Sequence, residues 1–203
     1  MIRLVLASRS SHLLVLAVVA LSVLSGLLGD RAVVIHLSAA HPQNRLPFPE
    51  LCAVVGVVVA AALARPRFWE WDRLGTHRAT AISVAYALAG MLLPLTVLVL
   101  GSARLPAEVP WAWQVSNYLV FAGVAFCLGP LVGPALAGGA TLVLYFGAGV
   151  VNHLLPRGRG FLPVTGYPGP ATHWAFAVSV VLLALVVHGL TRGATRWSRR
   201  AAG

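Results

Sequence analysis

Apolar residues in this chain occur in long runs that short polar segments separate. The runs lie near residues 11–29, 48–64, 80–101, 112–130, 134–154 and 172–191. A transmembrane helix needs about 20 mostly apolar residues, and each run approaches that length. The pattern therefore predicts an all-α integral membrane protein with six transmembrane helices, which form a single transmembrane domain over residues 1–203.

Two of these assignments depend on local features. The first run resembles a secretory signal, but it is longer than the usual apolar core of a signal and further spans follow it, so we interpret it as a retained helix. The sequence "GPLVGP" at 129–134 interrupts a long apolar region. Its prolines and glycines favour a tight reversal, which divides that region into two helices.

The composition supports lipid as the solvent. Hydrophobic residues make up 59% of the chain, charged residues only 10%, and the mean hydropathy is +0.85. A soluble domain carries roughly 25% charged residues. Although the formal net charge is +10, the basic residues sit in short clusters between apolar runs, which argues against nucleic-acid binding. Basic residues that are all arginine, with abundant alanine, glycine and proline, suggest a GC-rich bacterial genome and hence a bacterial plasma membrane.

The arginines also predict the orientation. With the N-terminus inside, the cytoplasmic segments contain ten arginines: Arg3, Arg9, Arg65, Arg67, Arg73, Arg78, Arg192, Arg196, Arg199 and Arg200. The outer segments contain five: Arg31, Arg45, Arg104, Arg157 and Arg159. The positive-inside rule therefore predicts that both the N- and C-termini are cytoplasmic.

Two features predict how the third span packs. Ala81, Ala85 and Ala89 recur at four-residue intervals and form a stripe of small residues that allows close helix approach in lipid. Pro94 lacks a backbone N–H and crowds the carbonyl of Gly90. We expect a kink at that point.

The sequence gives little support for catalysis. It contains no GxSxG, HExxH or Walker A pattern and no CxxC pair, since Cys52 and Cys127 are isolated. The acidic residues lie at span ends or in loops: Asp30, Glu50, Glu70, Asp72 and Glu108. Ion-coupled carriers usually need ionisable groups within the membrane. We therefore predict a chain that is not an enzyme, has no cofactor of its own, and takes energy from another chain.

Four histidines, His36, His41, His153 and His173, are predicted near the outer face. His153 ends the fifth span and His173 begins the sixth, so the two could approach and share a metal or haem. In the alternative interpretation they are interfacial histidines bonded to backbone or water.

The most polar segment is "RPRFWEWDRLGTHR" at 65–78, in the predicted cytoplasmic loop 65–79. Phe68, Trp71 and Leu74 would form one apolar stripe on a short amphipathic helix, with Glu70 and Arg73 spaced to pair beside it. A two-turn helix is marginally stable in water and needs a surface.

That surface is either the lipid headgroup layer or a cytoplasmic partner. Acidic residues would be repelled by an anionic membrane surface, which favours the partner. The predicted partner-binding residues are Phe68, Trp69, Glu70, Trp71, Asp72, Arg73 and Leu74.

This layout resembles the membrane (permease) subunit of an actinobacterial-like ABC-2 type exporter. In that family a short coupling helix between spans two and three docks on an ATPase, and "RFWEWDRLG" at 67–75 occupies that position. The family also has an irregular segment outside between spans five and six, where this chain has the Gly/Pro-rich loop 155–171. The resemblance implies a homodimer or a heterodimer with a related permease, and ATP and Mg bound by a separate ATPase subunit.

Three functions follow from the sequence. The first is a permease subunit of an ATP-driven export system. The second is a membrane scaffold or assembly protein that docks a partner through the same loop without transport. The third is a haem- or metal-dependent membrane enzyme that uses the outer histidines.

Overall fold

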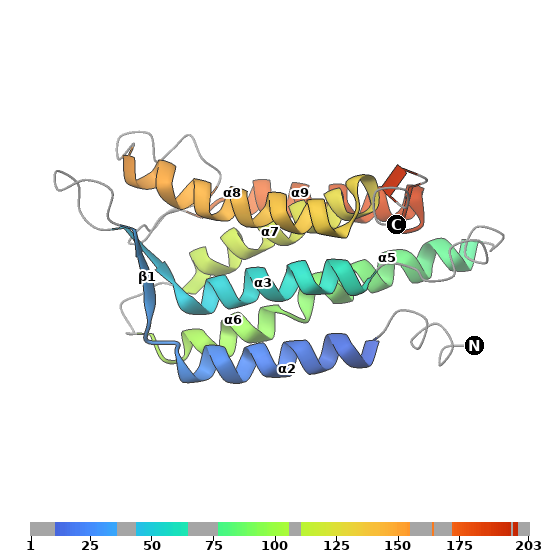
Figure 1. Ribbon diagram of the computed structural model, residues 1–203. Helices are drawn as coiled ribbons and strands as arrows, with labels where there is room; N and C mark the ends of the chain where they lie inside the picture. The colour runs from blue at the N-terminus through green and yellow to red at the C-terminus, as the bar shows by residue number, and fades with distance from the viewer. Residues whose placement is uncertain are drawn as a thin grey trace.

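The computed structural model describes residues 11–35, 44–64, 77–105, 111–154, 164, 172–195 and 197–198. Most of these residues are helical (Figure 1). The helices are α2 (Ser11–Leu27), α3 (Phe48–Leu63), α5 (His77–Leu92), α6 (Leu95–Ser102), α7 (Trp111–Val132), α8 (Pro134–Leu154) and α9 (Trp174–Thr191).

The helices run up and down in one bundle, and the chain reverses direction between successive helices except between α5 and α6, which run the same way (Figure 1). The start of α2, the start of α5 and the end of α9 lie at one end, which we call the α5 end. The start of α3 and the end of α8 lie at the other end, which we call the hairpin end after the pair of strands described next. Helix α7 contacts α3, α8 and α9, so it forms the centre of the bundle.

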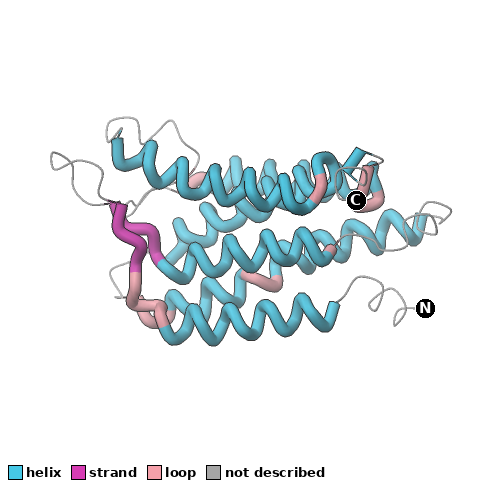
Figure 2. Tube along the Cα trace, viewed as in Figure 1, coloured by secondary structure: helices cyan, strands magenta, loops and turns pink. Residues whose placement is uncertain are grey.

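An antiparallel hairpin that the sequence pattern did not predict lies at the hairpin end (Figure 2). It pairs β1 (Ala32–Ile35) with β2 (Asn44–Pro47), and Val33 lies opposite Leu46. The run of β-branched residues in β1 favours extended backbone. The prediction of an all-α chain is therefore incomplete, because apolar run length locates spans and carries no information on short paired strands.

The observed helices coincide closely with the six predicted apolar runs. In the described part of the chain, four segments are long and apolar enough to cross a membrane: Ala79–Ser102, Gln114–Val132, Pro134–Asn152 and Trp174–Thr191. Helices α2 and α3 are apolar but shorter, with 17 and 16 residues. The structure thus supports a helical membrane-associated protein, and the six spans with cytoplasmic termini stay a prediction.

The outer surface of the bundle is strongly apolar. Leu190 is 81% exposed, Val143 71% and Leu16 63%. Only 17% of the α9 span is buried inside the bundle. Soluble monomers rarely expose contiguous apolar surface on this scale, so lipid is the solvent that suits these faces.

The predicted interruption at Pro94 is confirmed. Helix α5 ends at Leu92 and α6 begins at Leu95, with a turn between them. The break frees backbone carbonyls that a continuous helix would use, and the buried Tyr118 hydroxyl donates a hydrogen bond to the Met91 carbonyl. Ser25 Oγ donates to the Val97 carbonyl at 2.9 Å on the other side of the turn. Side chains from α7 and α2 therefore stabilise the kink.

The Tyr118→Phe variant tests this arrangement. Loss of the hydroxyl leaves the Met91 carbonyl without this buried donor, so we expect the free energy of unfolding to fall by about 1–2 kcal/mol. Denaturant titration of the purified protein in detergent measures the change. Tyr86→Phe is the control, because the Tyr86 hydroxyl is only part-buried and lies 3.4 Å from Ser11 Oγ. Equal losses in the two variants would contradict the proposed role of Tyr118.

The predicted small-residue stripe on α5 is wrong as a packing surface within the chain. Ala81, Ala85 and Ala89 are all exposed. The buried face of α5 carries Ser83, Ala87 and Gly90 instead. A four-residue interval fits several faces of one helix, and the contacts with α9 and α7 select the face that is buried.

Candidate functional site

A buried carboxyl group lies near the hairpin end of the bundle. Glu50 is in the first turn of α3, directly after β2 and Pro49, where proline and an acidic residue both suit a helix start. Glu50 and Val54 are one turn apart on the buried face of α3. As a result Glu50 is only 2% exposed.

Helix α7 brings polar side chains to the same end of the bundle. Gln114 is fully buried and Asn117 is 2% exposed, in an otherwise apolar helix. The Asn117 side-chain amide is hydrogen-bonded to Glu50. Gln114, Asn117 and Phe121 are spaced by three and four residues, so they share one face of α7.

Helix α8 adds an aromatic side chain. Tyr145 is 2% exposed, and its phenol is near enough to Glu50 and Cys52 to interact with them electrostatically. Its ring meets Phe121 edge to face, with centroids 5.2 Å apart and planes at 79°. We call Glu50, Gln114, Asn117, Phe121 and Tyr145 the Glu50 site.

The Glu50 site contains polar atoms that are buried without a hydrogen-bond partner. Among the described residues, Gln114 Oε1, Gln114 Nε2 and Tyr145 Oη are in this state. An unpaired buried polar group costs about 1–3 kcal/mol. In an apolar bundle, groups of this kind are expected where a ligand or water supplies the missing partners.

The hairpin covers this end of the site. Leu46 of β2 packs in one cluster with Val54, Phe121 and Tyr145, and Val33 of β1 packs against that cluster. On α8, Asn152 Nδ2 donates to the Val164 carbonyl at 3.3 Å and fixes Val164 beside the same cluster. The hairpin therefore covers Val54, which is one turn after Glu50 on the buried face of α3.

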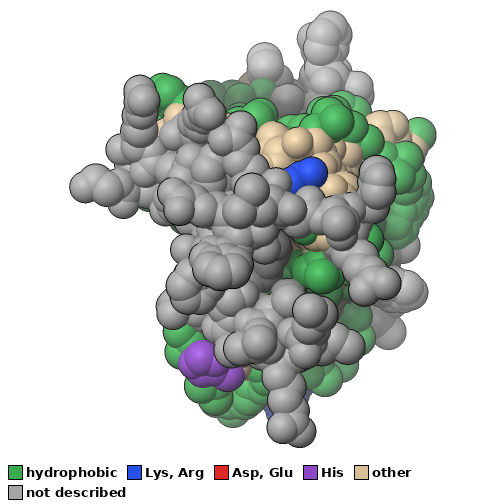
Figure 3. Space-filling view, turned by 90° about the vertical axis from the view of Figure 1, so that its right-hand side faces the viewer, with side chains coloured by type: hydrophobic (Ala, Val, Ile, Leu, Met, Phe, Trp, Pro, Cys, Tyr) green, Lys and Arg blue, Asp and Glu red, His purple; other side chains and the backbone are tan. Residues whose placement is uncertain are grey.

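The predicted partner-binding residues lie outside the described part of the chain, which omits residues 65–76. The helices on either side are described: α3 ends at Leu63 and α5 begins at His77, both toward the α5 end of the bundle (Figure 1). Figure 3 views this end, where the described surface is largely hydrophobic and includes basic and histidine side chains. The predicted coupling helix stays a prediction.

The predicted outer histidines are only partly described. His36 and His41 lie outside the described residues, and of His153 only the helical backbone is described. His153 is at the end of α8 and His173 directly precedes α9, and both of these helix ends lie toward the hairpin end. The backbone N–H of His173 donates to Ser116 Oγ at 3.2 Å, and His173 Nε2 is buried without a described partner. Among the described residues, no group of three potential metal ligands lies together.

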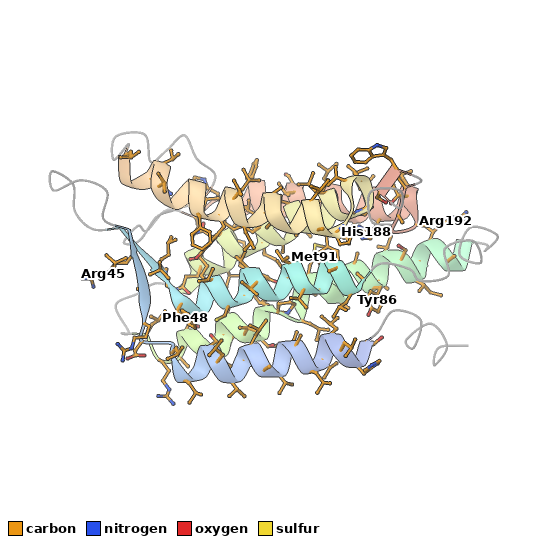
Figure 4. The ribbon with its side chains drawn as sticks, in the orientation of Figure 1. Arg45, Phe48, Tyr86, Met91, His188 and Arg192 are labelled. Atoms are coloured by element: carbon orange, nitrogen blue, oxygen red, sulfur yellow. The ribbon has the colours of Figure 1, made fainter. Side chains whose placement is uncertain are left out.

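The sequence analysis missed His188, which is buried near the α5 end (Figure 4). Its ring lies 5.5 Å from that of Phe126, beside a small cavity that Gly129, Pro130 and Ser198 also line. Arg192 and Gly193 both have positive φ, 53° and 88°, and turn the chain back over this cavity. Thr195 N–H then donates to the Pro130 carbonyl at 2.9 Å.

The sequence analysis placed Glu50 correctly at a span end but missed its burial. A signal was present, since "QVSNY" at 114–118 places three polar residues at the start of an apolar span. Polar residues in such a position favour contacts inside a bundle over contacts with lipid. Which helix they face is not encoded in their spacing, so their pairing with α3 required the structure.

Comparison of the chain with known protein families, curated proteins and solved structures finds no match in any of the three. The likeness to an ABC-2 type permease therefore rests on layout alone.

Proposed function

We propose that this chain is the permease subunit of an ATP-driven export system in a bacterial plasma membrane. In this proposal all six apolar runs cross the bilayer, both termini are cytoplasmic, and a separate ATPase docks on residues 68–74. A second permease, either another copy or a related chain, completes the transporter. The ATPase hydrolyses ATP with Mg, and this chain binds the cargo.

One observation carries the proposal: α3 connects the predicted docking segment to the Glu50 site as a single helix. Glu50 is in its first turn, and Leu63 at its other end comes just before residues 65–76. At 1.5 Å per residue a helix of this length spans about 24 Å. A push on the docking segment would therefore move Glu50 relative to Asn117 and Tyr145, which belong to other helices.

The second connection from the docking segment supports the same mechanism. Helix α5 begins at His77, directly after that segment, and ends at the turn before Pro94. Tyr118 of α7 is bonded to Met91 in the last turn of α5. A shift of α5 would thus reach α7, which carries Gln114 and Asn117.

The Glu50 site also favours transport over a scaffold role. A scaffold needs an apolar exterior and a docking loop, whereas a buried carboxyl group with unpaired polar neighbours destabilises the bundle. Ionisable groups inside membrane bundles typically mark substrate or ion pathways. The scaffold and the histidine-dependent enzyme remain the alternatives.

Co-purification tests the docking segment. The chain is expressed with candidate ATPases encoded beside its gene, and the ATPase recovered with it is quantified. We expect the double variant Trp71→Ser, Asp72→Ala to lower recovery about tenfold or more, because tryptophans at the centre of interfaces contribute about 2 kcal/mol or more. Nucleotide-dependent cargo export should fall with it.

Trp197→Ser is the matched control, because Trp197 is 59% exposed and follows α9 at the α5 end of the bundle. Its ATPase recovery should stay unchanged. The proposal is refuted if the double variant at Trp71 and Asp72 recovers the ATPase fully. It is also refuted if a cysteine at position 71 is labelled from outside the cell.

A further inference from the structure

The Glu50 site has a buried carboxyl group and hydrogen-bonding capacity that the described residues leave unmatched. Glu50 has the Asn117 amide as a partner, and the amide is neutral. The side-chain carbonyl oxygen and amide nitrogen of Gln114 and the hydroxyl of Tyr145 are buried and unpaired. These groups come from three helices, α3, α7 and α8, and they lie at the same end of the bundle.

The described basic residues near this end do not neutralise Glu50. Arg31 pairs with Asp30 at 3.8 Å on the surface, and its side chain is 74% exposed. Arg45 is exposed and points away from the bundle, while Phe48 lies at the start of α3 (Figure 4). Arg104 is exposed as well. A cation that meets Glu50 must therefore come from outside the described part of the chain.

The unpaired groups restrict the chemistry of that cation. A carboxylate and the Gln114 carbonyl oxygen accept hydrogen bonds from an ammonium group. Gln114 Nε2 and Tyr145 Oη can donate, so they need an acceptor on the same ligand. A bare metal ion satisfies the oxygens and leaves the Gln114 N–H donors unpaired. The rings of Phe121 and Tyr145 also favour a cation with apolar substituents.

We propose that the Glu50 site binds an organic ammonium group that carries a hydroxyl or carbonyl acceptor nearby, as in an amino alcohol or an amino-terminal peptide group. Glu50 binds the ammonium, Gln114 and Tyr145 bind the acceptor, and Phe121 packs against the carbon atoms. This inference rests on the proposed function and deepens it, since it names the class of cargo.

Titration of the purified chain in detergent, without any ATPase, tests the site. Ethanolamine hydrochloride is the probe, because it carries an ammonium group and a hydroxyl. Ethylene glycol keeps the hydroxyl without the charge, methylammonium keeps the charge without the hydroxyl, and sodium chloride tests an inorganic cation. Calorimetry and the shift in melting temperature report binding.

We expect ethanolamine to bind more tightly than methylammonium, and ethylene glycol and sodium to give no saturable signal. Glu50→Gln keeps the shape and a bond to Asn117 but removes the charge, so it should weaken ethanolamine binding about tenfold or more. Tyr145→Phe should weaken it about threefold to tenfold. Tyr118→Phe, on the α5-facing side of α7, is the control and should change binding less than twofold.

The inference is overturned if ethanolamine does not bind, or if the Glu50→Gln variant binds it equally well. It is also overturned if ethylene glycol or sodium binds as tightly as ethanolamine. Glu50→Gln replaces a buried carboxyl group by a neutral amide of the same shape, so a folded variant is expected, and size-exclusion chromatography confirms it. Because the isolated chain is used, loss of amine binding overturns this inference alone. If amine binding is intact but the double variant at Trp71 and Asp72 recovers as much ATPase as the wild type, the transport function is overturned instead.

Discussion

Gly123→Val is expected to separate α7 from α9 and to lower the free energy of unfolding by about 3 kcal/mol or more. A Cβ atom at position 123 would lie 2.7 Å from Val180 Cγ1, 2.9 Å from the Val180 backbone carbon and 3.0 Å from the Val181 nitrogen. Two of these neighbours are backbone atoms of α9, so a rotamer change cannot relieve the overlap. Because lipid tails are themselves apolar, the hydrophobic effect does not bring two helices together in a membrane. The association of α7 with α9 therefore depends on close packing.

Gly147→Ala is the matched control for Gly123. It is also a helical glycine, in α8, but a Cβ atom there would meet nothing within 4 Å. Because alanine has the higher helix propensity, we expect the control to stabilise the protein by up to about 1 kcal/mol. Denaturant titration in detergent compares the two. A destabilisation of the same size in both variants would show that α7 and α9 do not pack through Gly123.

Phe126→Ala is expected to destabilise the protein by about 3–5 kcal/mol, because it removes a fully buried ring where α5, α7 and α9 meet. The ring lies over Gly90, where an added Cβ would be 2.5 Å from Phe126 Cζ. On its other side the His188 ring lies 5.5 Å away. The void left by the substitution is bordered by rigid helices and cannot collapse fully.

A double-mutant cycle separates this packing from a general loss of apolar surface. Gly90→Ala alone should destabilise the protein, whereas in the Phe126→Ala background the added methyl points into the new void and should be tolerated. Phe176→Ala is the lipid-facing control, since Phe176 is 44% exposed on α9, and its effect should stay within about 0.5 kcal/mol. Additive effects at positions 90 and 126 would contradict the observed contact.

These two positions connect stability with the proposed mechanism. Gly123 and Phe126 hold α7 against α9 and α5, while Asn117 on the same helix bonds Glu50 of α3. Close packing of α7 against α5 would let a shift of α5 reach α7, as the proposed mechanism requires. Variants at these sites should therefore be compared with the wild type only under conditions where the protein stays folded.

Particular residues show which features of the fold the sequence pattern predicted. Apolar run length predicted the positions of the helices, because a helix that faces lipid must be apolar over its whole length. Pro94 predicted the break between α5 and α6, because its ring excludes a continuous hydrogen-bond ladder. The hairpin at 32–47 was missed, since short strands carry a weak local signal.

The sequence analysis also did not predict the candidate site, which matters more for function than the missed hairpin. The sequence analysis assigned Glu50 to a span end and the polar residues of "QVSNY" to a separate span. Their meeting depends on which faces of α3, α7 and α8 turn inward, and long-range packing decides that. The stripe of Ala81, Ala85 and Ala89 failed for the same reason, because several faces of α5 contain small residues and α9 selects another one.

The sequence by itself determined that this chain forms apolar helices, roughly where each begins and ends, and where one of them breaks. These properties depend on neighbouring residues and on the solvent, and both are encoded locally. Only the tertiary structure decided that Glu50, Asn117 and Tyr145 share one buried site. Each belongs to a different helix, and the rotation of those helices about their axes is fixed by contacts such as those of Gly123 and Phe126 with residues far away in the chain.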